Sequence, residues 1–390
     1  MSQRFPYTAR LRQLPPYLFA EIDRLKQEAM RKGIDIINLG IGDPDLPTPS
    51  HIVKRMAEAV ADPRNHQYPS YEGLLEFRQA VADWYRDRFG VTLDPQTEVL
   101  TLIGSKEGIG HVPLAFIDPG DAVLIPDPGY PVYQAGTVFA GGVPHPLPLY
   151  PSNDFLPDLE SIPLDILRKT KMLFLNYPNN PTAAVAPETF FPQAVNFAER
   201  HNLILCHDAA YSEIAFDGYR PGSLLNVAGA KEVAVEYHSL SKTYNMTGWR
   251  IGFVVGNAEV LAGLGRIKTN LDSGVFQAIQ QAGIEALKGP QDCVAWSCKI
   301  YQERRDVLVD GLKGLGWSIQ KPKASFYVWI PVLPRYTSLE LARRLLREAG
   351  IVTTPGVGFG PHGEGFIRAA LTVSVERIRE AVERIGQLTW

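Results

Sequence analysis

Short apolar runs alternate with helix-like segments through the middle of the chain. The runs are continuous, which is typical of strands that helices cover on both faces, and the segments between them repeat apolar residues at helical spacing. This alternation predicts an α/β fold with a mostly parallel sheet. The apolar runs lie at 99–103, 122–125, 172–175, 203–206, 233–235 and 251–255.

The two ends of the chain have a different pattern. Ser50 is the expected cap of a helix over 50–60, and the pattern is helical throughout 257–288. Beyond Gly316, short strands mix with helices, which predicts a smaller α+β domain. Further helices are expected at 74–89, 292–315, 338–349 and 372–388, and further strands at 326–330, near 351 and at 366–368.

The composition argues against several classes of protein. The 390 residues carry 39 Lys and Arg against 42 Asp and Glu, and this net charge of -3 argues against a dedicated nucleic-acid binder. Three cysteines cannot form a disulfide framework, and Cys293 and Cys298 lack the spacing of zinc ligands, so no metal site is expected. The sequence shows neither a signal peptide nor a membrane-spanning apolar stretch. We therefore expect a soluble, cytoplasmic protein.

The most informative stretch is the loop that follows the apolar run at 233–235. It contains two hydroxyl side chains, a lysine and an arginine, namely Ser239, Ser241, Lys242 and Arg250. Hydroxyl donors and a bidentate guanidinium suit a phosphate monoester. A lysine whose pKa is lowered can form a Schiff base with a carbonyl. A ligand that offers both a phosphate and an aldehyde is pyridoxal phosphate.

Two other strand ends carry residues that fit the same ligand. Ligands of open α/β sheets bind beyond the carboxyl ends of the strands. Ser105 and Lys106 open a helix there, and the free amides at a helix N-terminus favour a phosphate. Asp208 ends another strand, where its carboxylate could keep a pyridine nitrogen protonated.

Three residues in neighbouring loops could hold the ring. Tyr130 could stack on the ring face, and Asn180 and Tyr211 could bind its phenolic oxygen. Taken singly, each of these residues is equally well explained as a turn former or as part of the core. Because all these loops carry suitable residues, a cofactor site is favoured over separate roles in turns or in the core.

Together these motifs resemble the signature of the class I/II aminotransferases, which are pyridoxal-phosphate enzymes of fold type I. The resemblance covers essentially the whole chain. It implies a large domain over 45–288, with a mostly parallel sheet covered by helices on both faces, and a smaller α+β domain that combines 1–44 with 289–390. The motifs are Ser239-x-Ser241-Lys242, Gly248-x-Arg250, Asn176-x-Pro178-x-Asn180-Pro181-Thr182 and Asp208-x-x-Tyr211.

The resemblance also implies a role for each residue of the site. Lys242 would form the Schiff base and carry the proton between Cα and C4′, and Asp208 would bind the pyridine nitrogen. Arg368 would clamp the substrate α-carboxylate, aided by the amide of Gly42. Tyr130 would stack on the ring, Asn180 and Tyr211 would bind its oxygen, and Ser105, Lys106, Ser239, Ser241 and Arg250 would hold the phosphate.

Two tyrosines and one departure from the family pattern complete this comparison. Tyr17 matches a residue that lies over the substrate, and Tyr68 matches one that reaches the phosphate of the neighbouring subunit, which implies a homodimer. The family motif usually continues with glycine where this chain has Ala183. If that position needs a positive φ, Ala183 is strained by roughly 1 kcal/mol.

Within the family, the chain is most similar to the LL-diaminopimelate aminotransferase group of lysine biosynthesis. The similarity lies at 41–45, 68–73 and 244–250, and it implies ping-pong transfer of an amino group to 2-oxoglutarate. Better-studied members carry a glutamate, which reads the distal end of diaminopimelate, where this chain has Tyr71 followed by Glu72. Alanine, aspartate and methionine aminotransferases are therefore alternatives.

Three other classes of protein are alternatives. Pyridoxal-phosphate lyases that act at Cβ share the ring-binding motifs, so the motifs alone do not separate them from aminotransferases. A pyridoxal-phosphate-binding regulator would carry an additional DNA-binding domain, whereas this chain starts almost directly with the fold. A nicotinamide dehydrogenase would show Gly-x-Gly-x-x-Gly after its first strand, and this sequence does not.

Overall fold

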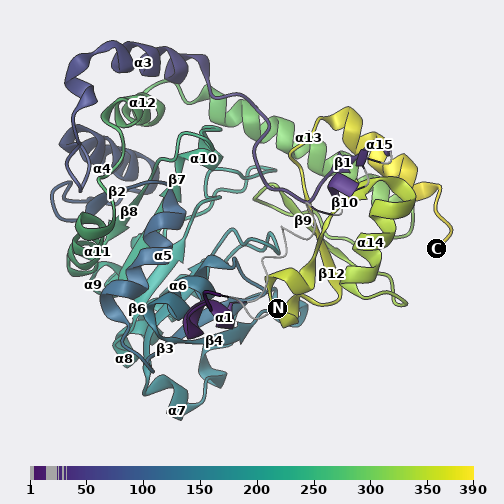
Figure 1. Ribbon diagram of the computed structural model, residues 1–390, viewed down its shortest axis with the longest axis horizontal. Helices are drawn as coiled ribbons and strands as arrows, with labels where there is room; N and C mark the ends of the chain where they lie inside the picture. The colour runs from purple at the N-terminus through teal and green to yellow at the C-terminus, as the bar shows by residue number, and fades with distance from the viewer. Residues whose placement is uncertain (1–3, 15–23, 25, 29, 32) are drawn as a thin grey trace.

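The computed structural model describes residues 4–14, 24, 26–28, 30–31 and 33–390. In it, the middle of the chain forms one seven-stranded sheet (Figure 1). Its strands are β2 (Val99–Leu102), β3 (Ala122–Asp127), β4 (Val143–Pro148), β5 (Thr170–Asn176), β6 (Ile204–Asp208), β7 (Ala234–Ser239) and β8 (Gly252–Gly256). The order across the sheet is β2-β8-β7-β6-β5-β3-β4. Only β8 runs antiparallel to its neighbours, so the predicted mostly parallel sheet is confirmed.

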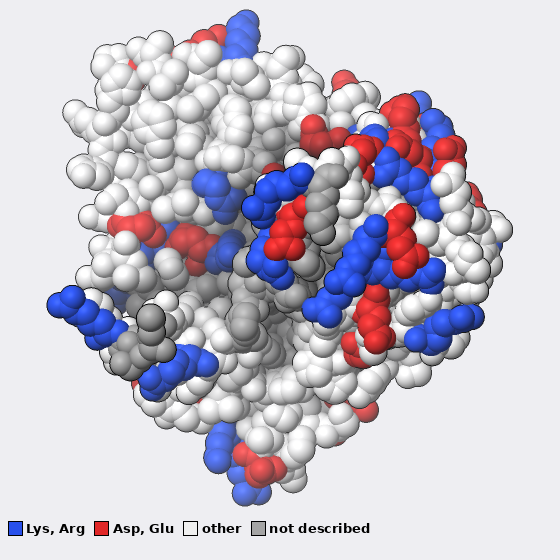
Figure 2. Space-filling model, turned by 45° about the vertical axis from the view of Figure 1, so that its right-hand side comes forward, with Lys and Arg blue, Asp and Glu red and all other residues white. Residues whose placement is uncertain are grey.

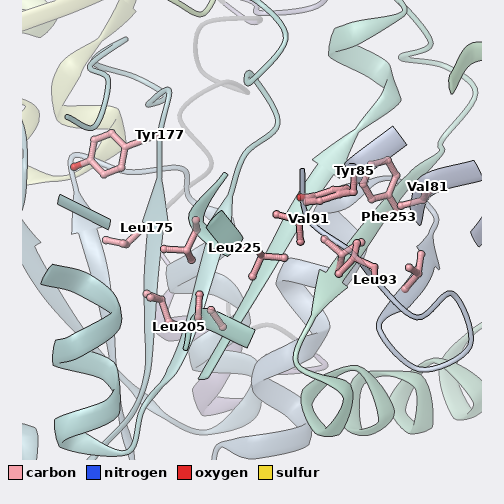
Figure 3. Packing of buried hydrophobic residues seen from close by; sticks show 14 of the residues in the cluster. Val81, Tyr85, Val91, Leu93, Leu175, Tyr177, Leu205, Leu225 and Phe253 are labelled. Carbon is pink, nitrogen blue, oxygen red and sulfur yellow. The ribbon is translucent and has the colours of Figure 1, made fainter. Parts of the chain in front are cut away.

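Helices cover both faces of this sheet (Figure 1). One face carries α3 (Ser50–Ala61), α4 (Leu75–Phe89), α8 (Phe190–His201) and α12 (Gln277–Lys288), and the other carries α5 (Ser105–Phe116), α6 (Val132–Ala140) and α11 (Ala258–Leu271). Figure 3 shows part of the first core, in which Tyr85 of α4 lies beside Phe253 of β8. Because successive strand residues point to opposite faces, Leu205 belongs to this core and Cys206 to the other.

The C-terminal part forms a smaller α+β unit with its own core. There β12 (Phe366–Ala370) lies between β9 (Tyr327–Pro331) and β11 (Thr354–Pro355) in an antiparallel sheet. The helices α13 (Asp292–Gly314), α14 (Ser338–Ala349) and α15 (Val375–Gly386) accompany it. β1 (Ile37–Asn38) pairs in parallel with β10 (Ile351–Val352), which joins the N-terminal segment to this unit. The expected α+β character of this region is confirmed.

Short helices complete the described structure. They are α1 (Ala9–Gln13), α7 (Leu164–Leu167), α9 (Ala230–Val233) and α10 (Leu240–Thr243). In the part of the chain that the structure describes, no helix combines the length and the apolar character needed to cross a membrane. Figure 2 shows charges of both signs on the right of the molecule and few charges at its upper left.

Two helix predictions are wrong in detail. Ser50 is the first helical residue of α3, not its cap, because the extended backbone of Pro49 occupies the N-cap position and the helix starts there. The segment 257–288 is not one helix, since α11 ends at Leu271 and α12 begins at Gln277. The break arises where Asp272 Oδ1 accepts a hydrogen bond from the amide of Gly274 at 2.8 Å, and where this glycine adopts a φ of 79°.

The apolar runs also predicted one strand too short and missed another. β7 continues to Ser239, beyond the apolar run, because Glu236 and His238 are buried as a hydrogen-bonded pair. β4 was not predicted at all, because prolines occupy alternate positions at 144, 146 and 148. Proline is tolerated there because β4 is an edge strand of the sheet.

The loop with the unusual alanine adopts the strained conformation that the sequence suggested. Ala183 has a φ of 58°, in the left-handed region where glycine is normally preferred. Its amide donates to Asn179 O at 2.9 Å, which closes the turn. The turn therefore forms with alanine, at an expected cost of roughly 1 kcal/mol.

Candidate active site

A cavity of about 540 Å³ opens at the carboxyl ends of the parallel strands. Its lining comes both from the large sheet, as with Asp208 of β6, and from the C-terminal unit, as with Arg368 of β12. Twelve of the fourteen predicted site residues line this cavity, and their individual roles stay predictions. They are Gly42, Ser105, Lys106, Tyr130, Asn180, Asp208, Tyr211, Ser239, Ser241, Lys242, Arg250 and Arg368.

The N-terminus of α5 forms one end of the cavity. Gly104 precedes the helix with a φ of 75°, and a Cβ at this position would lie 2.3 Å from Arg250 Nη2. Glycine therefore lets the guanidinium lie against the start of the helix. Arg250 Nη1 also donates to Thr247 O at 3.0 Å, and Ser239 and Ser241 line the same cavity. Free amides, hydroxyls and a guanidinium are the donor set of a phosphate site.

Asp208 lies buried at the last position of β6. Its Oδ2 accepts a hydrogen bond from Tyr133 Oη at 2.9 Å, and its Oδ1 accepts one from the amide of Ala210 at 3.3 Å. Burial raises the pKa of the Asp208 carboxyl, and these two hydrogen bonds oppose the rise. Burial also raises the pKa of Tyr133 well above its usual value, so the phenol remains a donor. A carboxylate held in this way can bind a protonated ring nitrogen.

Lys242 lies in α10, directly after β7. Its Nζ donates to Gly42 O at 3.2 Å and lies 5.5 Å from the centre of the Phe326 ring. Burial lowers the pKa of Lys242 from 10.5 to about 8; the arginines of the cavity add to this effect, and Asp43 and Asp208 oppose it. A substantial share of the amine is therefore neutral near pH 8, as a group that accepts a proton requires.

Arg368 is almost fully buried, with 2% of its surface exposed. Its Nη1 donates to Asn180 Oδ1 at 2.7 Å, and its Nη2 donates to Gly40 O at 2.9 Å. The guanidinium carbon lies 4.1 Å from the ring centre of Tyr327 and 4.6 Å from that of Phe359. These contacts fix the plane of the guanidinium, which suits the bidentate binding of a carboxylate.

Two tyrosine hydroxyls meet beside Gly42. A Cβ on Gly42 would lie 2.0 Å from Tyr327 Oη, so a side chain at this position would displace the tyrosine. Tyr327 Oη lies 3.2 Å from Tyr211 Oη. Burial raises the pKa of Tyr211 well above its usual value, so its hydroxyl is protonated and can donate to a ring oxygen.

Two predicted residues do not join this group. Tyr68 is 87% exposed and does not line the cavity of its own chain. Tyr17 lies outside the described residues. The expectation that Tyr68 serves a neighbouring subunit stays a prediction.

Several residues of the site were not predicted from the sequence. Tyr327, Phe359 and Asp43 line the cavity, and Tyr133 binds Asp208 from behind it. A signal was present for Tyr133, which follows the predicted Tyr130 by three residues, and the structure places the centres of the two rings 5.9 Å apart. Tyr327 lies in a strand that the pattern predicted, but nothing in the sequence indicates which way that strand faces.

A buried polar cluster lies on the other face of the strands that carry Asp208 and Ser239. Its centre is Glu236, whose carboxylate is fully buried. Tyr85 Oη, Ser223 Oγ and the amide of Leu224 donate to it at 2.6, 2.8 and 2.8 Å. His207 Nδ1 and His238 Nε2 lie 2.8 and 3.1 Å from it, and these histidines directly precede Asp208 and Ser239.

The residues of the cavity fit pyridoxal phosphate. The Gly104 contact makes room for a guanidinium at a helix N-terminus, which suits the phosphate. At the β6 end of the cavity, Asp208 suits the ring nitrogen, and the amine of Lys242 suits the aldehyde. Each functional group of the cofactor therefore has a chemically matched partner in this cavity.

Comparisons with known proteins agree with this site. Residues 34–385 match the family described as aminotransferase class I and II. The chain is 60% identical over 386 residues to an LL-diaminopimelate aminotransferase from Syntrophobacter fumaroxidans, covering 99% of this chain and all of that one. It is 57% identical to an LL-diaminopimelate aminotransferase from Desulforudis audaxviator, covering 98% of this chain and 97% of that one. Among solved structures, substrate-bound BacF from a Bacillus species superposes with a TM-score of 0.95 at 39% identity, covering 99% of this chain and 98% of that one. The chain therefore belongs to the class I and II aminotransferases.

Proposed function

We propose that the protein transfers an amino group from LL-diaminopimelate to 2-oxoglutarate in lysine biosynthesis. The observation that carries this proposal is the 60% identity, over almost the full length of both chains, with a curated LL-diaminopimelate aminotransferase. The cavity supports the reaction type, because it combines a lysine of lowered pKa with a rigidly held arginine. Alanine, aspartate and methionine are the competing amino donors.

Each side chain of the cavity has a separate role in the proposed reaction. Pyridoxal phosphate, when bound, supplies a ring that takes up the electrons left at the substrate Cα. Lys242 Nζ would take the proton from the substrate Cα and deliver it to C4′ of the cofactor, as its lowered pKa permits. Arg368 would hold the α-carboxylate, and Asp208 would keep a proton on the ring nitrogen. Tyr211 and Asn180 would bind the ring oxygen.

The phosphate would lie at the N-terminus of α5. Ser105, Lys106, Ser239, Ser241 and Arg250 would hold it there, and Tyr130 would lie against the ring. The division into a large domain over 45–288 and a small domain of 1–44 with 289–390 is part of the proposal. The pairing of β1 with β10 and the separate C-terminal core support it. The cytoplasmic location expected from the sequence stays a prediction.

We also propose that the protein acts as a homodimer in which Tyr68 completes the partner's phosphate site. The exposure of Tyr68 and its absence from the cavity of its own chain support this. Large apolar side chains are exposed on neighbouring segments, since α3 and α4 both contact α12 and Gly274 approaches Tyr71, as expected of a surface that a second copy covers. They include Val53, Val60, Tyr71, Leu75, Leu271 and Phe276.

The absorbance spectrum of the protein loaded with pyridoxal phosphate tests the function directly. Addition of LL-diaminopimelate, without an acceptor, is expected to move the long-wavelength band of the cofactor to shorter wavelength. Lys242→Ala is the matched control, and its band is expected not to move to shorter wavelength on the same timescale, because the proton shift needs the Lys242 amine. A band that moves with alanine, aspartate or methionine, but not with diaminopimelate, would show that the proposed substrate is wrong.

A further inference from the structure

Six charged side chains line the cavity, and five of them have a task in the proposed reaction. Four are the cations Lys106, Lys242, Arg250 and Arg368, and one is the buried Asp208. The sixth is Asp43, which neither the phosphate, the ring nor the α-carboxylate requires. A substrate that reaches beyond these groups therefore meets Asp43 as the remaining charge.

The backbone holds Asp43 firmly at this position. Gly40 O accepts a hydrogen bond from Arg368 Nη2, and Gly42 O accepts one from Lys242 Nζ. Asp43 is exposed although it lines the cavity, so it lies on the open side. Among the described residues, no side chain or amide forms a hydrogen bond or ion pair with its carboxylate.

Asp43 and Lys242 line the same cavity, and the residue before Asp43 binds the amine, since Gly42 O accepts from Lys242 Nζ at 3.2 Å. Among the charged groups around Lys242, Asp43 has the largest effect on the pKa of the amine, ahead of both arginines and of Asp208. The substrate carbon that reacts must lie beside Lys242. A substrate side chain that extends from there toward the open side would meet Asp43.

We infer that Asp43 binds the second ammonium group of the amino donor, at the end of the substrate far from the reacting carbon. This inference rests on the proposed function, because diaminopimelate carries an ammonium group at each end. A carboxylate and an ammonium form a charge-assisted hydrogen bond, which is stronger than a neutral one.

The same carboxylate acts against a substrate that ends in a carboxylate alone. 2-Oxoglutarate has no ammonium group, so the carboxylate of Asp43 only repels its distal carboxylate. Removing the charge at position 43 should therefore weaken binding of diaminopimelate and strengthen binding of 2-oxoglutarate. Opposite effects on the two substrates of one active site are not expected from a general loss of structure.

The test compares two donors in wild type and in Asp43→Asn. The donors are LL-diaminopimelate and L-2-aminopimelate, which has the same carbon chain and both carboxylates but lacks the distal amino group. We expect kcat/KM for diaminopimelate to fall by about tenfold, equivalent to about 1.4 kcal/mol, while the value for 2-aminopimelate changes little. The KM for 2-oxoglutarate should fall. Glu72→Gln is the matched variant, since it neutralises the carboxylate next to Tyr71, and it should not change the ratio of the two donors.

Each outcome has a distinct meaning. Equal losses for both donors in Asp43→Asn would show that Asp43 acts through Lys242 or through the fold, and would overturn the inference. A selective loss in Glu72→Gln instead would assign the distal ammonium to Glu72, and would also overturn it. A wild-type enzyme that uses other amino acids but not diaminopimelate would overturn the proposed substrate, and the inference with it. The cofactor absorbance of each variant confirms that the site is intact.

Discussion

Burial acts in opposite directions on the two ionisable residues at the centre of the site. It lowers the pKa of Lys242 to about 8, which provides the neutral amine that the reaction needs. It raises the pKa of Asp208, although the proposed role of that carboxylate, holding a proton on a ring nitrogen, needs its ionised form. The hydrogen bond from Tyr133 favours the ionised form of Asp208, so Tyr133 is a positioning residue.

Tyr133→Phe is therefore expected to raise the pKa of Asp208. Since the proposed reaction requires the ionised carboxylate, the acid limb of the profile of kcat against pH should move to higher pH. A hydrogen bond to a charged group is worth roughly 1.5–3 kcal/mol, so the affinity for pyridoxal phosphate should also fall, by about tenfold or more. Kinetics across pH and a titration of the apoprotein with the cofactor measure both effects.

Tyr177→Phe is the matched control for this prediction. Tyr177 is also a buried tyrosine, and its hydroxyl donates to Phe155 O at 2.7 Å, away from Asp208. It should leave the acid limb in place. If both variants shift the profile equally, the effect is general and Tyr133 has no specific role.

The sequence was sufficient for those site residues that lie in linear motifs. Lys242, Asp208 and Asn180 could be predicted because each lies at or just after the end of a strand, within a characteristic motif. Asp43 could not, because its importance depends on which loops meet in space, and the signal for Tyr133 was only its position three residues after Tyr130. From the sequence alone, a carboxylate after Gly42 is explained as an ordinary turn residue. Only the structure shows that it lines the same cavity as Lys242.

At the level of the element, β7 shows why apolar runs are an incomplete guide to strands. Its first half is apolar, but Glu236 and His238 are polar and still fully enclosed by the fold. A buried charge is tolerated because it is surrounded by hydrogen-bond donors. The predicted strands were correct where apolar side chains fill both faces, and incomplete where a polar cluster replaces them.

Glu236→Gln is expected to destabilise the protein by about 3–5 kcal/mol, because it removes the charge to which five groups of the cluster are oriented. Unfolding in urea, followed by circular dichroism, measures this. Glu98→Gln is the control, since Glu98 pairs with Lys231 near the surface and should cost about 1 kcal/mol or less. Equal losses in both variants would contradict a special role for the buried cluster.

The same cluster gives the stability a definite dependence on pH. Burial alone would raise the pKa of Glu236, but the bonds with His207 and His238 lower it well below its ordinary value of 4.5. A lowered pKa in the folded state stabilises the protein above pH 4.5, and this contribution is lost as the pH falls through the folded-state pKa. Wild type should therefore lose more stability in acid than Glu236→Gln.

At the scale of the whole molecule, the segment that contains β1 and Asp45 is held by the C-terminal unit, and it also lines the active site. β1 pairs with β10, and Arg304 of α13 binds both oxygens of Asp45 at 2.7 and 2.8 Å. The short segment between β1 and Asp45 contains Gly42 and Asp43. The cavity is therefore completed by a segment that the C-terminal unit holds in place.

The proposed dimer predicts that two defective subunits repair each other. Tyr68→Phe and Lys242→Ala, each alone, should lose most of their activity. A hybrid dimer of the two contains one site with an intact Lys242 and an intact Tyr68 from the other subunit, so it should recover about half of the wild-type activity. Co-expression with two affinity tags isolates the hybrid. A hybrid no more active than the Tyr68→Phe dimer would show that Tyr68 does not cross between subunits.

The prolines of β4 determine how copies of this protein can meet. The amide of Val143 donates to Asp121 O in the sheet, and successive amides of a strand point in opposite directions, so those at 144, 146 and 148 would face outward. Proline has no amide hydrogen, so this edge offers no donors to an incoming strand. At the opposite edge, the amide of Thr101 in β2 is bound to Glu72 O. The sheet thus resists extension, which protects the folded protein against edge-to-edge aggregation and leaves helices and loops as the surfaces through which subunits associate.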